Sequence, residues 1–286
     1  MSDDILTAHG LEVAFGARRT LFGVAKPAVK VLHGVTLRIG RGETVGIVGE
    51  SGSGKTTLGR AMLRLIDVSA GEVRFDGRDI THLDERDLRP LRRRMQLIFQ
   101  DPMASLNPRR TIRRIVLEPM LFHGIAKNAA DAEAHARAIF DRFSLPIACL
   151  DRYPHELSGG QRQRVGIARV ALLAPDFVLA DEIVSGLDVS TQAQALNLLK
   201  DLSRDLGLSM AFISHDLSVI RAVCDRVYVL RLGRVVEEGP CAQVFAGPQN
   251  AYTRALLDAI PLPRIDPGWL GRASARDEEP ESRETA

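Results

Sequence analysis

A glycine-rich stretch directly after a short apolar run constrains the fold of this chain more than any other feature. The run is Thr44-Val-Gly-Ile-Val48, and the stretch Gly49-Glu-Ser-Gly-Ser-Gly-Lys-Thr56 fits the phosphate-binding pattern G-x-x-x-x-G-K-S/T. Its glycines permit backbone angles that other residues resist, so the loop can curl with its N–H groups pointing inward. A helix that begins near Lys55 would add its positive N-terminal end. The pattern therefore predicts a nucleoside-triphosphate site between a strand and a helix.

Each residue of the loop has an expected role at that site. Lys55 would reach the β- and γ-phosphates, and the Thr56 hydroxyl would bind Mg²⁺. The other residues predicted to contact the nucleotide are Gly49, Glu50, Ser51, Gly52, Ser53, Gly54 and Thr57. The alternative is a glycine-rich turn with no ligand. A dinucleotide fingerprint fits poorly, because Thr57 stands where a third Gly or Ala is needed.

Length and composition leave room for one large globular domain, with or without an inserted lobe, in 286 residues. A net charge of +2 requires neither nucleic acid nor an anionic membrane as partner. The three cysteines are far apart and form no C-x-x-C pair, which favours a reducing, cytoplasmic location. The acidic start of the chain argues against a secretory signal. Because no run of 18 apolar residues occurs, we expect any membrane role to depend on partner proteins.

Apolar runs alternate with helical patterns along the chain, which predicts parallel strands joined by crossover helices. The expected strands are Leu11–Phe15, Val31–Ile39, Thr44–Val48, Glu72–Phe75, Met95–Phe99, Phe177–Ala180, Met210–Ile213 and Arg226–Leu230. Helical patterns cover Lys55–Ile66 and Thr111–Phe143. Five arginines between positions 86 and 94 are interpreted as a solvated helix face, with a nucleic-acid patch as the alternative. The charge-rich tail from Arg272 onward predicts disorder.

A second anion receptor is predicted at Leu157-Ser-Gly-Gly-Gln161, which precedes a basic helical stretch. The Ser158 hydroxyl and the amides of Gly159 and Gly160 at a helix N-terminus can hold a phosphate. One nucleotide rarely needs two receptors from the same subunit. Two subunits packed head to tail would instead pair the glycine-rich loop of one with the Ser158 receptor of the other.

An acid pair follows the apolar run Phe177–Ala180. At the carboxyl end of such a strand, Asp181 can hold Mg²⁺ through water, and Glu182 can activate a water for attack on the γ-phosphate. The alternative is a strand that ends in a charged turn. Beside a phosphate loop, the catalytic interpretation is preferred.

With these segments together, residues Leu11–Pro263 resemble the nucleotide-binding subunit of ATP-binding-cassette (ABC) transporters, most of all the oligopeptide, dipeptide and nickel importer branch. The resemblance implies an α/β P-loop NTPase: a mostly parallel sheet core, an antiparallel β subdomain and an inserted α-helical lobe. The implied ABC domain is 1–263, with the lobe at about 101–165, and 264–286 form a tail. The segments that carry the resemblance are Gly49–Thr56, Ile98–Pro108, Leu157–Arg164, Leu179–Ser190, Phe212–Leu217 and Ala251–Leu257.

The same resemblance implies roles for residues outside the loop. Gln100 would contact Mg²⁺ and the attacking water, His215 would contact the γ-phosphate and position Glu182, and Asp188 would couple the two sites of a dimer. Gln161 belongs to the second receptor. Phe15 would stack on adenine, with Phe22 or plain core packing as alternatives.

Three departures from the family pattern stand out. Ile183 replaces a proline after the acid pair, and Gly186 replaces an alanine; neither removes a ligand, so we expect hydrolysis with a less rigid loop. The tail after Pro263 lacks the cysteine-containing extension of this branch, which predicts no iron–sulfur cluster.

The function that the resemblance implies is ATP hydrolysis, with Mg²⁺, to drive import of di- or oligopeptides, or alternatively of nickel or another small solute. The implied partners are two transmembrane permease subunits, a second ABC ATPase subunit and, indirectly, an extracytoplasmic solute-binding protein, but no nucleic acid. The subunit would sit peripherally at the cytoplasmic face of the inner membrane. A soluble ABC ATPase of DNA repair or translation is the rival from another class. A GTPase is disfavoured because no Asn-Lys-x-Asp motif occurs.

Overall fold

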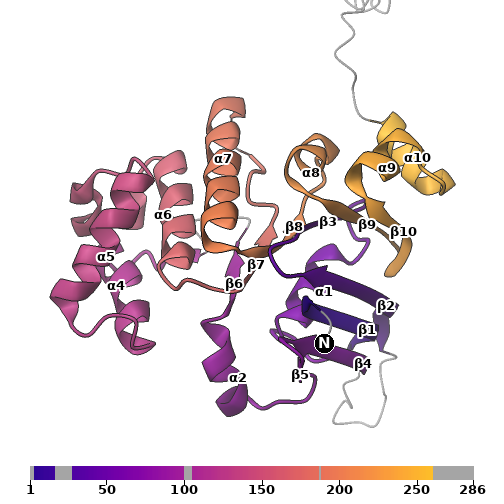
Figure 1. Cartoon of the computed structure of the whole chain (residues 1–286), viewed down its shortest axis with the longest axis horizontal. Coiled ribbons are helices and arrows are strands. Elements are labelled where there is room, and N and C mark those ends of the chain that lie inside the picture. The colour runs from indigo at the N-terminus through magenta and orange to yellow at the C-terminus, as the bar shows by residue number, and fades with distance from the viewer. Residues whose placement is uncertain (1–2, 17–27, 100–104, 187, 260–286) are drawn as a thin grey trace, which may run out of the picture.

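A six-stranded sheet forms the centre of the computed structural model, which describes residues 3–16, 28–99, 105–186 and 188–259. Its strand order within these residues is β10-β9-β3-β8-β7-β6 (Figure 1). The strands are β3 (Thr44–Val48), β6 (Met95–Ile98), β7 (Phe177–Asp181), β8 (Ser209–Ile213), β9 (Arg226–Arg231) and β10 (Arg234–Pro240). All neighbours pair in parallel except β9 and β10. The carboxyl ends of the parallel strands therefore share one edge, where ligands bind in sheets of this kind.

A smaller, antiparallel sheet in the order β2-β1-β4-β5 packs beside the first. It comprises β1 (Asp4–Phe15), β2 (Val29–Gly40), β4 (Ala70–Phe75) and β5 (Arg78–Asp79). The sequence located β1, β2 and β4 but missed the two-residue strand β5. It placed the start of β1 seven residues too late, because Gly10 interrupts the alternation near its middle. Both sheets agree with the expected fold class.

Helix α1 (Lys55–Met62) joins the two sheets in one hydrophobic core. Its buried Leu58, Ala61 and Met62 share a cluster with inward residues of β1, β2, β3, β7 and β8. A Cβ at Gly59 would come within 2.6 Å of Leu179 Cδ2, so glycine allows the helix to lie close against the sheet. The helix ends four residues earlier than predicted because the chain turns at Arg64, whose φ is 52°.

A helical region follows β6 and packs against the opposite face of the six-stranded sheet. The two together form a second hydrophobic core cluster. It contains α4 (Ile112–Phe122), α5 (Ala129–Arg142), two 3₁₀ turns (Ile147–Asp151 and Pro154–Glu156), α6 (Gly159–Ala171) and, after β7, α7 (Val189–Leu206). The helical pattern of 111–143 forms two helices, because Gly124 takes a φ of 65° and the Asn128 side chain caps α5 by accepting from the Asp131 N–H. The proposed domain boundary at residue 263 lies outside the described residues.

Three short helices complete the described chain: α8 (Leu217–Val223), α9 (Cys241–Ala246) and α10 (Ala251–Asp258). Figure 1 places α9 and α10 beside β10, at one end of the six-stranded sheet. Among the described helices, none is long and apolar enough to cross a membrane.

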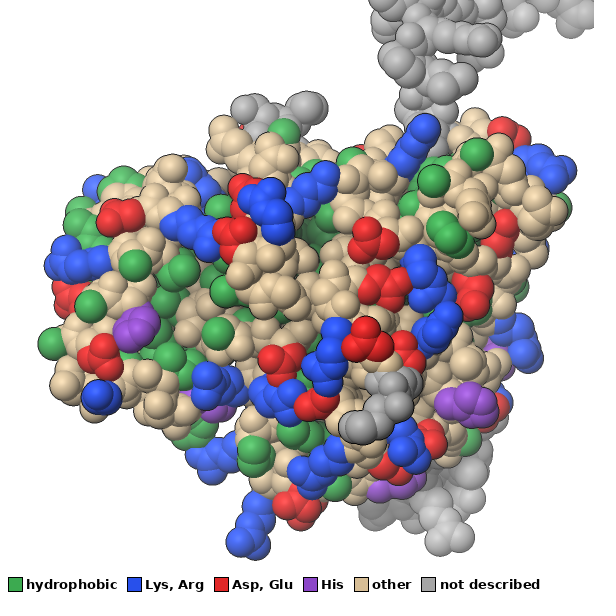
Figure 2. Space-filling model, viewed as in Figure 1, with side chains coloured by type: hydrophobic (Ala, Val, Ile, Leu, Met, Phe, Trp, Pro, Cys, Tyr) green, Lys and Arg blue, Asp and Glu red, His purple; other side chains and the backbone are tan. Residues whose placement is uncertain are grey.

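The arginines near α2 (Glu85–Arg92) do more than face solvent. Arg92 donates to the carbonyl oxygen of Arg64 at 3.0 Å, and Arg94 pairs with both Asp76 and Asp176. These contacts tie the two sheets and α1 together, so part of the predicted solvated face is structural. Blue and red side chains alternate over the face shown in Figure 2 and do not gather in one basic patch there.

Candidate nucleotide-binding and hydrolysis site

The glycine-rich loop leaves β3 at the shared carboxyl edge and turns into α1. Gly49 has a φ of 149°, and a Cβ there would lie 2.1 Å from the carbonyl oxygen of Leu230 on the neighbouring strand β9. Gly54, at the N-cap of α1, has a φ of 103° and provides no side-chain cap. The first N–H groups of α1 therefore keep their capacity to bind an anion.

Lys55 is the first residue of α1 and lies across the loop. Its Nζ donates to the carbonyl oxygens of Gly49 and Glu50, both at 2.8 Å, and the residue is only 6 % exposed. Burial lowers the pKa of Lys55, while the nearby carboxylates of Glu182 and Asp181 raise it. A largely desolvated cation next to a helix N-terminus attracts phosphate strongly.

Thr56 and Asp181 bring a hydroxyl and a carboxylate together from two elements. The Thr56 hydroxyl donates to Asp181 Oδ1 at 3.2 Å, and Asp181 ends β7 with 8 % exposure. Burial raises the pKa of Asp181, and the adjacent Glu182 raises it further. Oxygen ligands of this kind suit Mg²⁺, and a dication would offset the desolvation of the carboxylate.

The loop itself also fits a polar ligand. Within the part of the chain that the structure describes, the buried hydroxyl of Ser53 has no hydrogen-bond partner. Beside the loop is a cavity of about 450 Å³. It is lined by Val31, Ser51, Gly52, Gly54, Lys55, Thr56, Thr57 and Glu182. The donor set and the space both fit Mg²⁺ and a nucleoside triphosphate.

Glu182 projects from a strained turn at the end of β7. Its φ of 49° is rare for a residue with a side chain. Its N–H donates to the carbonyl oxygen of Ile213 at 2.9 Å, and its Oε2 lies 3.7 Å from His215 Nδ1. His215 is in the turn after β8, where the Ser214 hydroxyl accepts from the Asp216 N–H and Asp216 caps α8. The imidazole is thus within reach of the carboxylate without a direct hydrogen bond.

Ser158 and Asp188 cap two neighbouring helices. The Ser158 hydroxyl accepts from the Gln161 N–H at 3.2 Å, and Gln161 Oε1 accepts from the Ser158 N–H at 3.0 Å, which forms a capping box at α6. Asp188 caps α7 by accepting from the Thr191 N–H and hydroxyl. Ser158, Gly159 and Asp188 are exposed. Figure 1 shows α6 well separated from α1, so the two predicted phosphate receptors are not combined within one chain.

Two predicted residues stand apart from this arrangement. Phe15 ends β1 with 46 % exposure and pairs with Val29, two residues before the cavity-lining Val31. Its stacking role stays a prediction. Gln100 and the alternative Phe22 lie outside the described residues.

Gln163 is a site residue that the sequence reasoning missed. Its Nε2 donates to the carbonyl oxygen of Ile183 at 2.7 Å, and Gln163 and Ile183 are 2 % and 1 % exposed. The contact joins α6 directly to the turn that carries Glu182. The helical spacing of Gln163 with the buried Ile167 and Val170 was the available signal.

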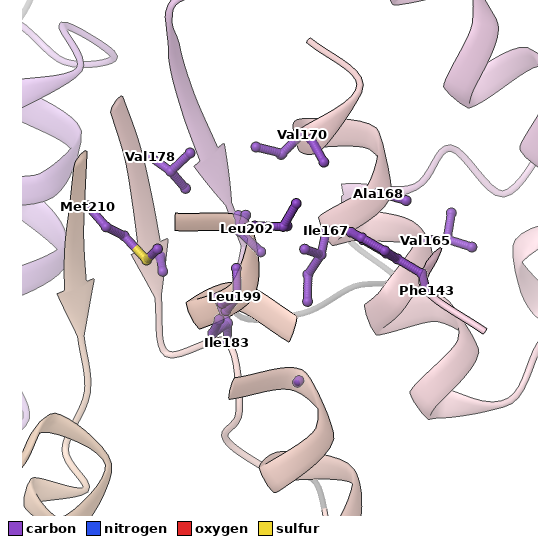
Figure 3. Packing of buried hydrophobic residues seen from close by; sticks show 14 of the residues in the cluster. Phe143, Val165, Ile167, Ala168, Val170, Val178, Ile183, Leu199, Leu202 and Met210 are labelled. Carbon is purple, nitrogen blue, oxygen red and sulfur yellow. The ribbon is translucent and has the colours of Figure 1, made fainter. Parts of the chain in front are cut away.

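The two departures after the acid pair have different structural settings. Ile183 packs in the same core cluster as Leu199 and Leu202 (Figure 3), so its side chain anchors the turn that a proline would stiffen. Gly186 has a φ of 76°, which glycine adopts without strain.

Comparison with known proteins gives the family. A family model described as ABC transporter matches residues 32–185. A putative peptide import ATP-binding protein of Brucella ovis is 56 % identical over 238 residues, which are 83 % of this chain and 75 % of that protein. The glutathione import ATP-binding protein GsiA of Salmonella paratyphi A is 45 % identical over 260 residues, covering 91 % of this chain but 42 % of its own length.

Solved structures agree with this match. The dimeric ATP-binding cassette MJ0796, in a post-hydrolysis state with ADP and Pi, has a TM-score of 0.73 at 29 % identity and covers 82 % of this chain and 98 % of its own. CbiO1 of Clostridium perfringens, part of an ABC transporter complex, has a TM-score of 0.72 at 26 % identity, with 86 % and 92 % covered. The chain belongs to the ABC transporter family. The predicted family, fold class and enzyme class, an ATP hydrolase that uses Mg²⁺, are confirmed.

Proposed function

We propose that this chain energises an importer of di- or oligopeptides, with its catalytic residues at the carboxyl edge of the six-stranded sheet. The observation that carries the proposal is the convergence there of the loop after β3, the acid pair after β7 and His215 after β8. Peptide as cargo is supported by the name of the Brucella ovis relative. The match to this chain covers 75 % of that relative's length.

The proposed division of labour follows from the contacts described above. Lys55 and the N–H groups at the start of α1 hold the β- and γ-phosphates. Thr56 and Asp181 hold Mg²⁺, which neutralises phosphate charge when bound. Glu182 accepts the proton of the attacking water, and the hydrogen bond from its N–H to the Ile213 carbonyl helps to hold the turn that carries it. His215, 3.7 Å from Glu182, orients that carboxylate and contacts the γ-phosphate.

A second cassette, either another copy or a sibling, completes each site in this proposal. The exposed Ser158 receptor at the start of α6 is far from α1 of its own chain, so it is free to face the nucleotide of the other cassette. Asp188, the N-cap of α7, would link the two sites. ATP then stabilises the closed dimer by joining groups that neither subunit brings together alone.

Contact with the membrane subunits is proposed at the exposed apolar residues that end α4, Leu121 and Phe122. Their exposed fractions are 39 % and 60 %, and the Arg89 guanidinium lies 4.5 Å from the centre of the Phe122 ring. Nearby cationic groups favour a permease segment that carries an acidic residue next to apolar ones. The subunit would thus be peripheral at the cytoplasmic face of the membrane.

Purification from native membranes tests the proposal. We expect permease subunits to co-purify with the tagged chain. The Phe122→Asp variant should lose these subunits but keep its affinity for ATP. Cells that carry Glu182→Gln should stop importing peptides. Glu182→Gln should bind ATP yet hydrolyse it about 10²–10⁴-fold more slowly, because the positioned base is lost. Uptake of nickel instead of peptide would show that the cargo is nickel and not a peptide. Association with ribosomes or DNA, or near-normal turnover by Glu182→Gln, would overturn the proposal.

A further inference from the structure

The C-terminal segment Ala251–Leu257, which marked the importer branch in the sequence, makes a direct contact with the phosphate loop. It forms most of α10, and its Tyr252 is 8 % exposed. Tyr252 Oη accepts a hydrogen bond from the backbone N–H of Glu50 at 3.0 Å. The two residues are 202 positions apart, so the contact is made by the fold and not by local sequence.

The contact fixes one peptide plane of the loop from both sides. The carbonyl of Gly49 and the N–H of Glu50 belong to the same trans peptide and point in opposite directions. Tyr252 accepts from the N–H, while the carbonyl oxygen accepts from Lys55 Nζ at 2.8 Å. Hydrogen bonds arranged in such a chain polarise one another. Rotation of this peptide would therefore move the acceptor that holds the lysine.

Tyr252 is itself held firmly by its surroundings. The Asn250 side chain caps α10 by accepting from the Tyr252 N–H at 2.9 Å, and the Asn250 N–H donates to Glu237 on β10 at 3.1 Å. The Arg231 guanidinium lies 4.8 Å from the centre of the Tyr252 ring. The phenol thus reaches the loop from a rigid, capped helix.

The location of α10 supports a role at the nucleotide site. A cavity of about 520 Å³ lies between the end of the α10 segment, the loop and the turn that carries His215. Leu256 and Ala259 line it on one side, and Gly49, Glu50 and His215 line it on the other. The helix therefore flanks the groups that bind and hydrolyse ATP.

We infer that Tyr252 is a positioning residue for Lys55, acting through the Gly49–Glu50 peptide. The inference rests on the proposed role of Lys55 in phosphate binding. Without the hydroxyl, the peptide loses one of its two anchors, and Lys55 is held less well over the loop. ATP binding should weaken, while the hydrolytic groups Glu182 and His215 keep their places.

The test compares two Tyr→Phe substitutions. Tyr252→Phe keeps the ring and removes the loop contact; we expect the KM and Kd for Mg·ATP to rise about 3–10-fold, the effect of one net hydrogen bond, with kcat within about twofold. Tyr228→Phe is the matched control: this tyrosine is 1 % exposed, and its hydroxyl accepts from the Arg38 N–H at 3.1 Å, away from the loop. It should lower the melting temperature without changing KM.

A double-mutant cycle separates the possible failures. In a Lys55→Ala background, Tyr252→Phe should change the Kd for Mg·ATP by less than about twofold, because the two substitutions disable one interaction. Equal KM values for Tyr252→Phe and the parent protein, or full additivity in the cycle, would overturn the inference. If Lys55→Ala alone left ATP affinity intact, the proposed phosphate site itself would be wrong.

Discussion

Replacement of Gln163 by methionine removes the link between α6 and the turn that carries Glu182. Methionine has nearly the same length and shape but no donor, so Ile183 loses the hydrogen bond that its carbonyl now receives at 2.7 Å. A buried carbonyl without a partner costs about 1–3 kcal/mol. We expect the free energy of unfolding of Gln163→Met to fall by that amount.

The same change should also affect catalysis. Glu182 is in the left-handed region, which costs about 1–2 kcal/mol and must be held there by its surroundings. With one restraint gone, the carboxylate shifts, and a misplacement of about 1 Å can lower the rate by up to about 10²-fold. We therefore expect kcat to fall at least about tenfold, with the KM for Mg·ATP within about twofold because Lys55 and Thr56 are untouched.

Two measurements decide the outcome: denaturant unfolding without nucleotide, and steady-state ATPase kinetics. Gln243→Met is the matched control, since Gln243 is exposed on α9 and its replacement should change stability by less than about 0.5 kcal/mol. If Gln163→Met lost stability but kept its kcat, the position of Glu182 would not depend on this bond. Unchanged stability would show that the bond itself contributes nothing.

Two further predictions concern the loop and the sheet contacts. Gly49→Ala should abolish measurable binding of a fluorescent ATP analogue, because its Cβ would lie 2.1 Å from the Leu230 carbonyl oxygen. Gly247→Ala is the control and should bind normally, because the space around its Cβ is open. Normal binding by Gly49→Ala would contradict this geometry. Hydrogen bonding from Arg94, with help from Arg41, holds the pKa of Asp76 below its ordinary value of 3.8. The contribution of ionised Asp76 to the free energy of unfolding is therefore present above pH 3.8 and is lost as the pH falls through the lower pKa that Asp76 has in the folded protein. Asp76→Asn should cost about 0.5–1 kcal/mol at pH 7 and progressively less below pH 3.8, and a pH-independent difference would contradict the assignment.

The sequence was sufficient for those parts of the fold and site in which local pattern and chemistry coincide. The apolar runs ended in polar residues, so parallel strands indicated that Lys55 and Asp181 lie at one edge, and the family resemblance added His215. The edge strand β10 was missed because its residues are mostly half-exposed and include few apolar ones. The break between α4 and α5 depends on a cap and a glycine that the helical period alone does not reveal.

Long-range contacts limited the site prediction. Tyr252 and Glu50 meet only in the folded chain, and nothing near either residue in the sequence indicates the pairing. Gln163 lies in a stretch that the sequence indicated only to be basic and helical, although its spacing matched the buried positions. Gly49 is required by the carbonyl of Leu230, a neighbour on another strand and not part of the loop pattern.

A nucleotide site shared between two cassettes is tested by the mass of a Glu182→Gln complex in Mg·ATP, measured by light scattering with the second cassette of the importer present. We expect a closed dimer that Ser158→Arg in this chain abolishes, while the isolated variant still binds ATP with unchanged affinity through its own Lys55. A Ser158→Arg variant that still closes around ATP, or that loses ATP binding as a monomer, would contradict it.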